Sequence, residues 1–265
     1  MSAASLLLAV LLLSPCLTAQ VESEPAPSFS ADSIVNSANG SASSLAPGVL
    51  ATIYGKNLAN TARTPSLGLG AGSLPKELDN VQVFVGGAAA PLLYVSPTQI
   101  NFLITSDKRV GRMSVEVLRQ SLYGGAQVTL VDVAPALFLV DGGKLAVTHV
   151  DGKLVSEDTP ASAGEIVIAW GAGLGITAPA AAGGDIPRVA GWIVRREEFR
   201  VLLDGQLLPS SNVLYAGIAP GFPGLYQINL RLPEIIATKQ PELRIGYEGQ
   251  MSQSGLTLPV SLGTP

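Results

Sequence analysis

The sequence predicts an all-β protein made of two tandem β-sandwich modules, and three observations lead to this prediction. The 265 residues include 29 Gly and 19 Pro, which separate short runs of β-forming residues, while charged residues make up only 14%. Those runs alternate between apolar and polar residues, as strands with one buried face do. Several of the runs also occur twice in the same order, which is typical of a duplicated module.

The N-terminal residues form a separate segment. Residues 5–19, SLLLAVLLLSPCLTA, are an apolar run ending in small residues, and we expect residues 1–19 to be a signal peptide cut after Ala19. The run is too short to predict a membrane span, so no transmembrane segment is expected in the mature chain. Lipidation at Cys16 is an alternative, because LSPC loosely resembles a lipobox. Either route leads to a secreted or cell-envelope protein, with residues 20–31 as a linker.

Cysteine content and charge exclude several classes of function. Cys16 is the only cysteine, so the mature chain would have neither a disulfide nor a thiol nucleophile. The net charge is −4, and an acidic chain with few charges argues against nucleic acid or an anionic membrane as a partner.

Four segments show the alternation most clearly: 80–87, 112–118, 165–171 and 199–205. In each, apolar residues two positions apart share one face, and we expect that face to be buried. Gly-Gly or Asp-Gly follows the first and the last segment, as tight hairpins require. The aligned residues are Val81, Val83 and Val85; Met113, Val115 and Val117; Ile166, Ile168 and Trp170; and Phe199, Val201 and Leu203.

The duplication sets the expected domain boundaries. LAPGVLATIYGKNLA at 45–59 is echoed by ASAGEIVIAWGAGLG at 161–175, and VQVFVGGAAAP at 81–91 by FRVLLDGQLLP at 199–209. The sequence therefore predicts one β-sandwich over residues 32–133 and a second over residues 134–265.

One phrase, Gln-Ile-Asn, occurs in both copies, in PLLYVSPTQINFLI at 91–104 and in GLYQINLRLP at 224–233. In both, the isoleucine falls on the apolar face, and the two amides fall together on the polar face. We interpret these amides as structural groups that hold the preceding loop against its strand. The alternative is that they bind a ligand. The repeated signature consists of Tyr94, Gln99 and Asn101 in the first copy and of Tyr215, Gln227 and Asn229 in the second.

Together these segments resemble a known family. LAPGVLATIYGKNLA, LPKELDNVQVFVGGAAAPLLYVSPTQINFLI, APALF, GAGLG and VLYAGIAPGFPGLYQINLRLP look like the uncharacterised C-terminal domain of secreted acidobacterial (Solibacter-type) proteins, over about residues 32–262. The APG…IYGKNL pattern is also similar to the IPT/TIG-like immunoglobulin-fold modules of plexins and transcription factors. The resemblance implies two tandem immunoglobulin-like (Ig-like) β-sandwiches and no particular activity.

The sequence offers no catalytic, cofactor or metal site. His149 is the only histidine, and no Gly-x-Ser-x-Gly supplies a nucleophile for it. A zinc site would need carboxylates nearly alone. Asp141, Asp151 and Asp204 each precede a glycine, in what we interpret as separate hairpin turns and not a calcium loop. No helix is expected after WGAGLG, as a dinucleotide site would require. We therefore expect no enzyme and no cofactor.

Two aromatic residues are weak candidates for ligand contacts. Trp192 lies in the inserted segment 176–198 and Phe222 in the loop GIAPGFPGLY, both rich in Gly and Pro. The alternative for Trp192 is a cap on the sandwich, and VRREEF at 194–199 is interpreted as a solvated strand start. We expect a non-catalytic module for adhesion, assembly, or ligand binding, with an extracellular polysaccharide or protein as partner. The alternative is an extracellular hydrolase or an accessory partner of a secreted enzyme.

Overall fold

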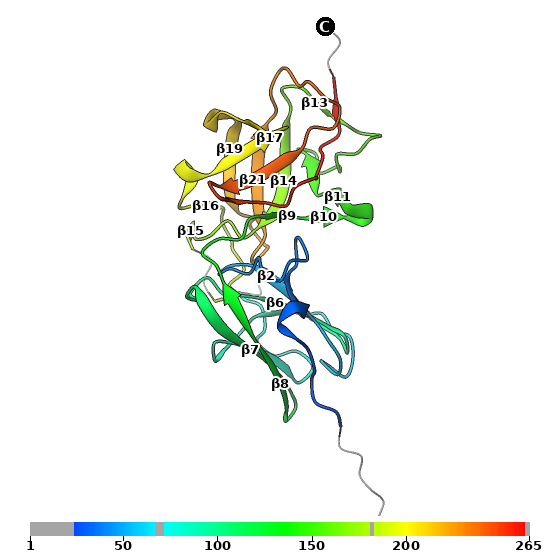
Figure 1. The fold of residues 1–265 in the computed structure, drawn as a ribbon, viewed down its shortest axis with the longest axis vertical. Coiled ribbons are helices and arrows are strands. Elements are labelled where there is room, and N and C mark those ends of the chain that lie inside the picture. Colours follow the sequence, from blue (N-terminus) through cyan, green and yellow to red (C-terminus); the bar gives the residue numbers. More distant parts are fainter. Residues whose placement is uncertain (1–23, 67–71, 181–182, 263–265) are drawn as a thin grey trace, which may run out of the picture.

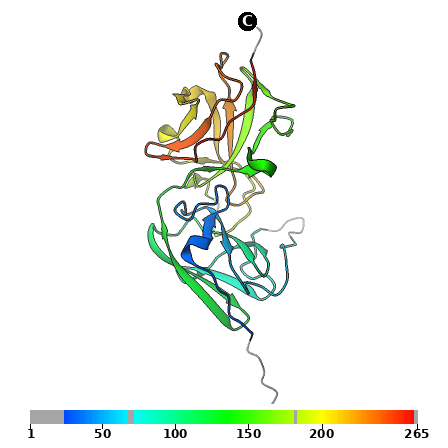
Figure 2. The same ribbon diagram turned by 45° about the vertical axis from the view of Figure 1, so that its right-hand side comes forward.

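The computed structural model describes residues 24–66, 72–180 and 183–262, and this part of the chain is almost entirely β. The expected signal peptide, Cys16 and the first residues of the expected linker lie outside the described residues. Two β-sandwich lobes are stacked end to end along the long axis (Figures 1 and 2). The prediction of an all-β, tandem sandwich fold is confirmed. The described residues contain no helix long and apolar enough to cross a membrane.

The first lobe, module 1, consists of two four-stranded antiparallel sheets. One sheet has the order β1 (Ile34–Asn36), β2 (Leu50–Tyr54), β6 (Gln99–Leu103), β5 (Leu92–Val95). The other has the order β4 (Ala88–Ala89), β3 (Val81–Val85), β7 (Gly111–Arg119), β8 (Leu122–Leu130). The core between the two sheets contains buried residues from Ile34 to Leu130. The short 3₁₀ helix η1 (Ala31–Ser33) directly precedes β1.

The second lobe, module 2, repeats this plan with additions. Its larger sheet has the order β12 (Val147–His149), β14 (Ile166–Ala172), β20 (Tyr226–Arg231), β19 (Val213–Ile218), β16 (Gly191–Ile193), β15 (Thr177–Ala178), and β9 (Ala136–Leu137) also pairs with β14. The facing sheet has the order β18 (Gln206–Leu207), β17 (Arg200–Leu203), β21 (Leu243–Tyr247), β22 (Gln250–Met251). Two small pairs join β10 (Leu139–Val140) to β11 (Lys144–Leu145) and β13 (Ala161–Ser162) to β23 (Val260–Ser261). Three short 3₁₀ helices complete it: η2 (Asp141–Gly143), η3 (Arg196–Glu198) and η4 (Ser210–Asn212).

The two modules share one register around the repeated phrase. Tyr94 of β5 pairs with Asn101 of β6, and Tyr215 of β19 pairs with Asn229 of β20. In both copies, an irregularity of the ladder lies directly before the tyrosine. A bulge in the same place fixes the same twist and the same side-chain directions, so the duplication extends to the details of the backbone.

The repeated amides bond each other and not the preceding loop. The Nε2 group of Gln99 donates to Oδ1 of Asn101 at 2.8 Å, and Gln227 donates to Asn229 at the same distance. In module 1 the buried hydroxyl of Thr52, on the neighbouring strand, also donates to Asn101 at 3.1 Å. The phrase therefore stiffens the outer face of a central strand, while its isoleucines lie fully buried in the cores.

Most faces predicted to be buried are buried, but β14 differs. Ile166, Ile168 and Trp170, which we expected in the core, are only partly buried, whereas Val167 and Ala169 are fully buried. Val167 and Ala169 lie opposite Leu230 and Ile228 of β20, which are core residues. Because paired residues of neighbouring strands point to the same face of a sheet, this register turns Val167 and Ala169 inward and their bulkier neighbours outward.

Part of the expected linker lies along module 1. Ser28 forms an isolated β-bridge with Lys56, and the buried guanidinium of Arg119 donates to the carbonyl of Pro25 at 2.8 Å. These contacts involve backbone groups of residues 24–30, which have no apolar periodicity. For that reason the sequence pattern does not predict that they dock.

Two sets of backbone hydrogen bonds in the described part of the chain help to join the modules. In the connection, Val131 donates to Leu45 of module 1 at 2.8 Å, and Ala134 donates to Gly173 of module 2 at 2.9 Å. Away from the connection, loop 72–74 bonds to loop 184–186 on either side of an isolated β-bridge, at 3.0 and 2.9 Å. Attachments at separate places restrain the modules against rotation about a single linker.

The unequal amide networks generate a first prediction. Asn101→Ala removes the acceptor of Thr52 and Gln99, whereas Asn229→Ala removes the acceptor of Gln227 alone, because Ile168 stands opposite Asn229. We expect losses of about 2–3 kcal/mol and about 1 kcal/mol, respectively, in the free energy of unfolding. Urea denaturation followed by circular dichroism measures both, and equal losses would contradict this account.

A second prediction concerns the junction. Gly173 and Gly205 have φ of +73° and +74°, so alanine costs about 1–2 kcal/mol at either position for backbone conformation alone. A β-carbon at Gly173 would overlap the carbonyl oxygen of Ala134, whereas one at Gly205 has nothing within 4 Å. We expect Gly173→Ala to be the more destabilising by about 1–3 kcal/mol. Thermal unfolding of the two variants tests this, and similar melting temperatures would contradict the close approach.

Candidate ligand-binding site

A groove of about 680 Å³ opens on the surface of module 2. It lies among β16, the segment from η3 to β17, the segment from β18 to η4, and β19. Its floor includes apolar residues of the core, and its rim carries one tryptophan with several polar side chains: Trp192, Arg196, Glu197, Arg200, Ser210 and Ser211. We refer to this site as the Trp192 groove.

Trp192 lies in β16, where it is paired with β15 on one side and with β19 on the other. Its neighbours Gly191 and Ile193 are buried, so Trp192 points away from the core, and 40% of its surface is exposed. Its ring packs edge-on against Tyr215, with 4.9 Å between the ring centroids. The Tyr215 hydroxyl donates to the carbonyl of Ile218 at 2.7 Å, which fixes the supporting ring. Trp192 is therefore both packed on the sandwich and available to a ligand.

The η3 wall of the groove is anchored from behind by Arg195. Its guanidinium lies 2.5 Å from Glu198 and 2.8 Å from Asp132, and it stacks 4.6 Å above the ring of Tyr247. Asp132 belongs to the connection between the modules, so the same arginine also ties that connection to module 2. This side chain is engaged in structure, which leaves Arg196 to face the groove.

Arg200 is partly fixed by the backbone at the beginning of β17. Its Nη1 donates to the carbonyl of Glu197 at 2.8 Å and to that of Phe199 at 3.1 Å. Arg196 and Glu197 form an ion pair of 3.2 Å between largely exposed side chains, which is a weak interaction. The segment VRREEF, interpreted from the sequence as a solvated strand start, thus supplies a wall of the groove.

The structure does not bring the two aromatic candidates together. Phe222 is 58% exposed in the loop between β19 and β20, and it does not line the Trp192 groove. Its loop faces module 1, because a β-carbon at Gly224 would lie 2.8 Å from Leu50 and Leu103. Trp192 and Phe222 therefore mark two different surfaces.

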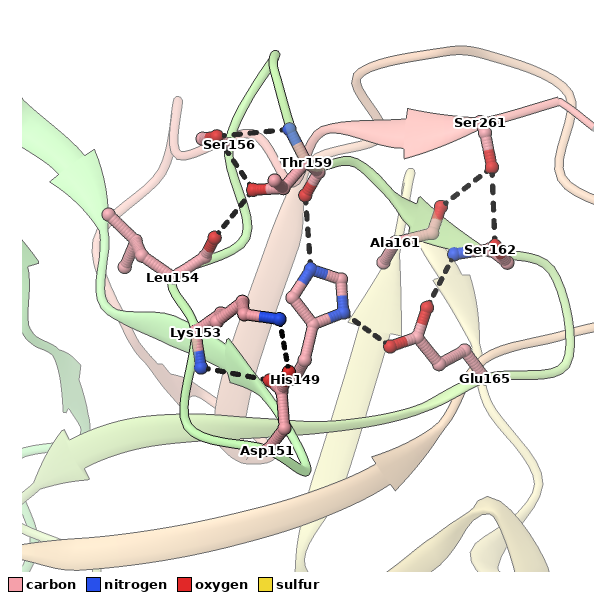
Figure 3. Close-up of polar contacts among 10 residues, drawn as sticks. All are labelled: His149, Asp151, Lys153, Leu154, Ser156, Thr159, Ala161, Ser162, Glu165 and Ser261. Atoms are coloured by element: carbon pink, nitrogen blue, oxygen red, sulfur yellow. Dashed lines mark hydrogen bonds and ion pairs between the residues drawn. The ribbon is translucent and has the colours of Figure 1, made fainter.

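Figure 3 shows the surroundings of His149, between the end of β12 and β13. Nδ1 lies 2.5 Å from a carboxylate oxygen of Glu165, and Nε2 lies 3.1 Å from the carbonyl oxygen of Thr159. Both partners are acceptors, so the ring makes both hydrogen bonds when both of its nitrogens carry protons, which is the imidazolium form. The hydrogen bond to Glu165 raises the pKa of His149, as this geometry requires. The second oxygen of Glu165 accepts from the backbone of Ser162 at 2.7 Å.

This arrangement differs from a catalytic triad. In a triad the distal ring nitrogen faces a nucleophilic hydroxyl, whereas here it faces a backbone carbonyl. The cluster instead joins the loop at Thr159 to the end of β12 and to the turn before β14. Among the described residues, no three His, Cys, Asp or Glu side chains gather as a metal site would require.

Comparison with known proteins bears mainly on module 1. Residues 33–131 match the family model of the IPT/TIG domain, which supports the IPT/TIG-like character inferred from the sequence. No match is found among curated proteins.

Similar solved structures include SGBP-B of a Bacteroides ovatus mixed-linkage glucan utilization locus, in complex with a mixed-linkage heptasaccharide. It is 12% identical, with a TM-score of 0.37, and the match covers 89% of this chain and 47% of that chain. SGBP-B from a Bacteroides uniformis xyloglucan utilization locus is 11% identical, with a TM-score of 0.28 and coverage of 89% and 50%. Domains 5-6 of the S-layer protein SbsC are 13% identical, with a TM-score of 0.26 and coverage of 90% and 100%. The chain thus spans about half the length of the two SGBP-B chains, and TM-scores this low do not assign a function.

The His149 cluster generates a prediction about pH. The pKa of His149 in the folded protein is raised above its usual value of about 6.5, so folding favours the charged ring. The stabilisation is complete below about pH 6.5 and is lost as pH rises through the raised folded pKa. We expect a lower free energy of unfolding at about pH 9 than at about pH 6. Denaturant titrations of wild type and His149→Gln measure this, and the same pH dependence in both proteins would contradict it.

Proposed function

We propose that this chain is a non-catalytic, extracytoplasmic protein that binds polysaccharide in the Trp192 groove. The observation that carries the proposal is a half-exposed tryptophan beside hydrogen-bonding side chains from three other elements. A sugar ring has an apolar face that stacks on an aromatic ring and hydroxyls that need polar partners. The groove supplies both kinds of contact, and its tryptophan lies in a strand that is paired on both sides.

The dimensions of the groove also support a carbohydrate ligand. A volume of about 680 Å³ falls in the range of pockets that hold small ligands, which favours a few sugar units of a longer chain. The groove is open to solvent along the rim formed by Leu207, which is 57% exposed. An open groove admits an internal segment of a polymer, whereas a closed cavity does not.

The proposed location rests on the sequence. The apolar run of residues 5–19 has the length and the ending of a signal peptide. Kinship with secreted acidobacterial proteins stays a prediction, as does the choice between free secretion and lipidation at Cys16.

A hydrolase is less well supported by this site. Glycoside hydrolysis commonly uses two carboxylates that flank the scissile bond. Of the described residues that line the Trp192 groove, Glu197 alone has a carboxylate, and it is paired with Arg196. The groove therefore favours binding without cleavage.

The proposal predicts a selective loss of binding. The purified protein is mixed with a panel of insoluble polysaccharides and bacterial cell-wall preparations, and the saturable bound fraction is measured. Trp192→Ala is expected to weaken binding about tenfold through the loss of the stacking surface. Phe222→Ala and Tyr123→Ala, which remove exposed aromatic rings elsewhere, are expected to bind like wild type.

Trp170, the other tryptophan of the chain, lies in β14 and reports the fold of module 2 in each variant. Loss of binding in Phe222→Ala with normal binding in Trp192→Ala would move the site to the loop near module 1. Absence of saturable binding to every preparation would reject a polysaccharide ligand.

A further inference from the structure

We infer that the polysaccharide is anionic and bears carboxylates, as a uronic-acid polymer does. We infer also that Arg200 is the residue that binds these carboxylates. This inference rests on the proposed function, because it concerns the ligand of the same groove. It is carried by the way in which the guanidinium of Arg200 is held.

One corner of the Arg200 guanidinium donates hydrogen bonds within the protein, and the opposite edge does not. Nη1 donates to two backbone carbonyls, those of Glu197 and Phe199, at 2.8 and 3.1 Å. In the described part of the chain, Nε and Nη2 have no hydrogen-bond partner. These two groups form the edge of a guanidinium that binds a carboxylate through two parallel hydrogen bonds.

Fixing one corner prepares the other edge for a ligand. An exposed arginine normally loses side-chain freedom when it binds an anion. The contacts with the 197 and 199 carbonyls have already restricted Arg200, so less freedom remains to be lost. A lysine cannot reproduce this arrangement, because its ammonium lacks the planar pair of donors.

Charge along the groove points to the same ligand. Two guanidinium groups, Arg196 and Arg200, line the groove against one carboxylate, that of Glu197. The whole chain has a net charge of −4, so this local excess of positive charge is not a general property of the protein. An anionic polymer would be repelled by most of the surface and attracted here, which favours binding in one place.

The test compares two polymers that share one sugar backbone, with free carboxylates in one and methyl esters in the other. Polygalacturonate carries one carboxylate on each sugar, and its fully methyl-esterified form has the same backbone without the charge. Affinity electrophoresis of the purified protein in gels containing either polymer measures both dissociation constants. We expect wild type to bind polygalacturonate at least about tenfold more tightly than the ester, with a preference that weakens as salt is added.

Variants at Arg200 assign the preference to one side chain. Arg200→Gln is expected to bind polygalacturonate about tenfold more weakly and the ester as wild type does. Arg200→Lys keeps the charge but loses the fork, so an intermediate affinity for polygalacturonate is expected. Arg112→Gln, an exposed arginine on β7 of module 1, serves as the matched control and should change neither affinity.

The outcomes separate this inference from the proposed function. Wild type could bind the two polymers with equal affinity, and Trp192→Ala could lose affinity for both. That result would overturn the inference of an anionic ligand and support the Trp192 groove as the binding site. Binding of neither polymer, with saturable binding to a neutral polysaccharide, would have the same meaning. An equal loss of affinity for both polymers in Arg200→Gln would assign Arg200 a structural role and overturn its part in recognition.

Discussion

The register of one central strand in each module determines the rest of the structure. β6 and β20 each lie between two antiparallel partners, with Ile100 and Ile228 pointing into the cores. A slip by one residue would exchange the buried and exposed faces, so the register cannot vary without loss of the core. On the outer face, the same Gln-to-Asn hydrogen bond stiffens both strands. The side-chain contacts of the repeated phrase lie within the sheets, and the structural role expected for it stays a prediction.

Periodicity predicted the strands wherever only one face of a strand is apolar. Val81, Val83 and Val85 alternate with polar or partly exposed residues, and they are fully buried as expected. In β14 both faces are apolar, so alternation alone could not choose between them. The register with β20 makes the choice, since Val167 and Ala169 lie opposite its core residues Leu230 and Ile228. Pairing between distant strands, which alternation within one strand does not reveal, decides the orientation there.

The candidate site was only partly visible in the sequence. Trp192 was identifiable because an aromatic residue in a segment rich in Gly and Pro has few structural reasons to be there. Arg200 and Ser210 were not, because they reach the groove only when β17, in the facing sheet, is packed against β16 and β19. Tyr215 was singled out as a mark of the repeat, and its ring proves to support Trp192. Local patterns identify single side chains, whereas a groove depends on how separate elements meet.

The segment 176–198 explains why the groove is found in module 2. It was expected to be an insertion, but its counterpart in module 1, residues 60–80, has nearly the same length. Among the described residues, segment 176–198 adds β15 and β16 to the larger sheet and ends in η3, whereas residues 60–66 and 72–80 form isolated β-bridges. Within the same segment, residues 184–186 bond to module 1. One segment thus forms a wall of the groove and holds the two modules together, so the direction in which the groove faces is fixed relative to module 1. The duplicated strands supply the frame and one wall of the groove with Arg200, and segment 176–198 adds Trp192 and Arg196 to it.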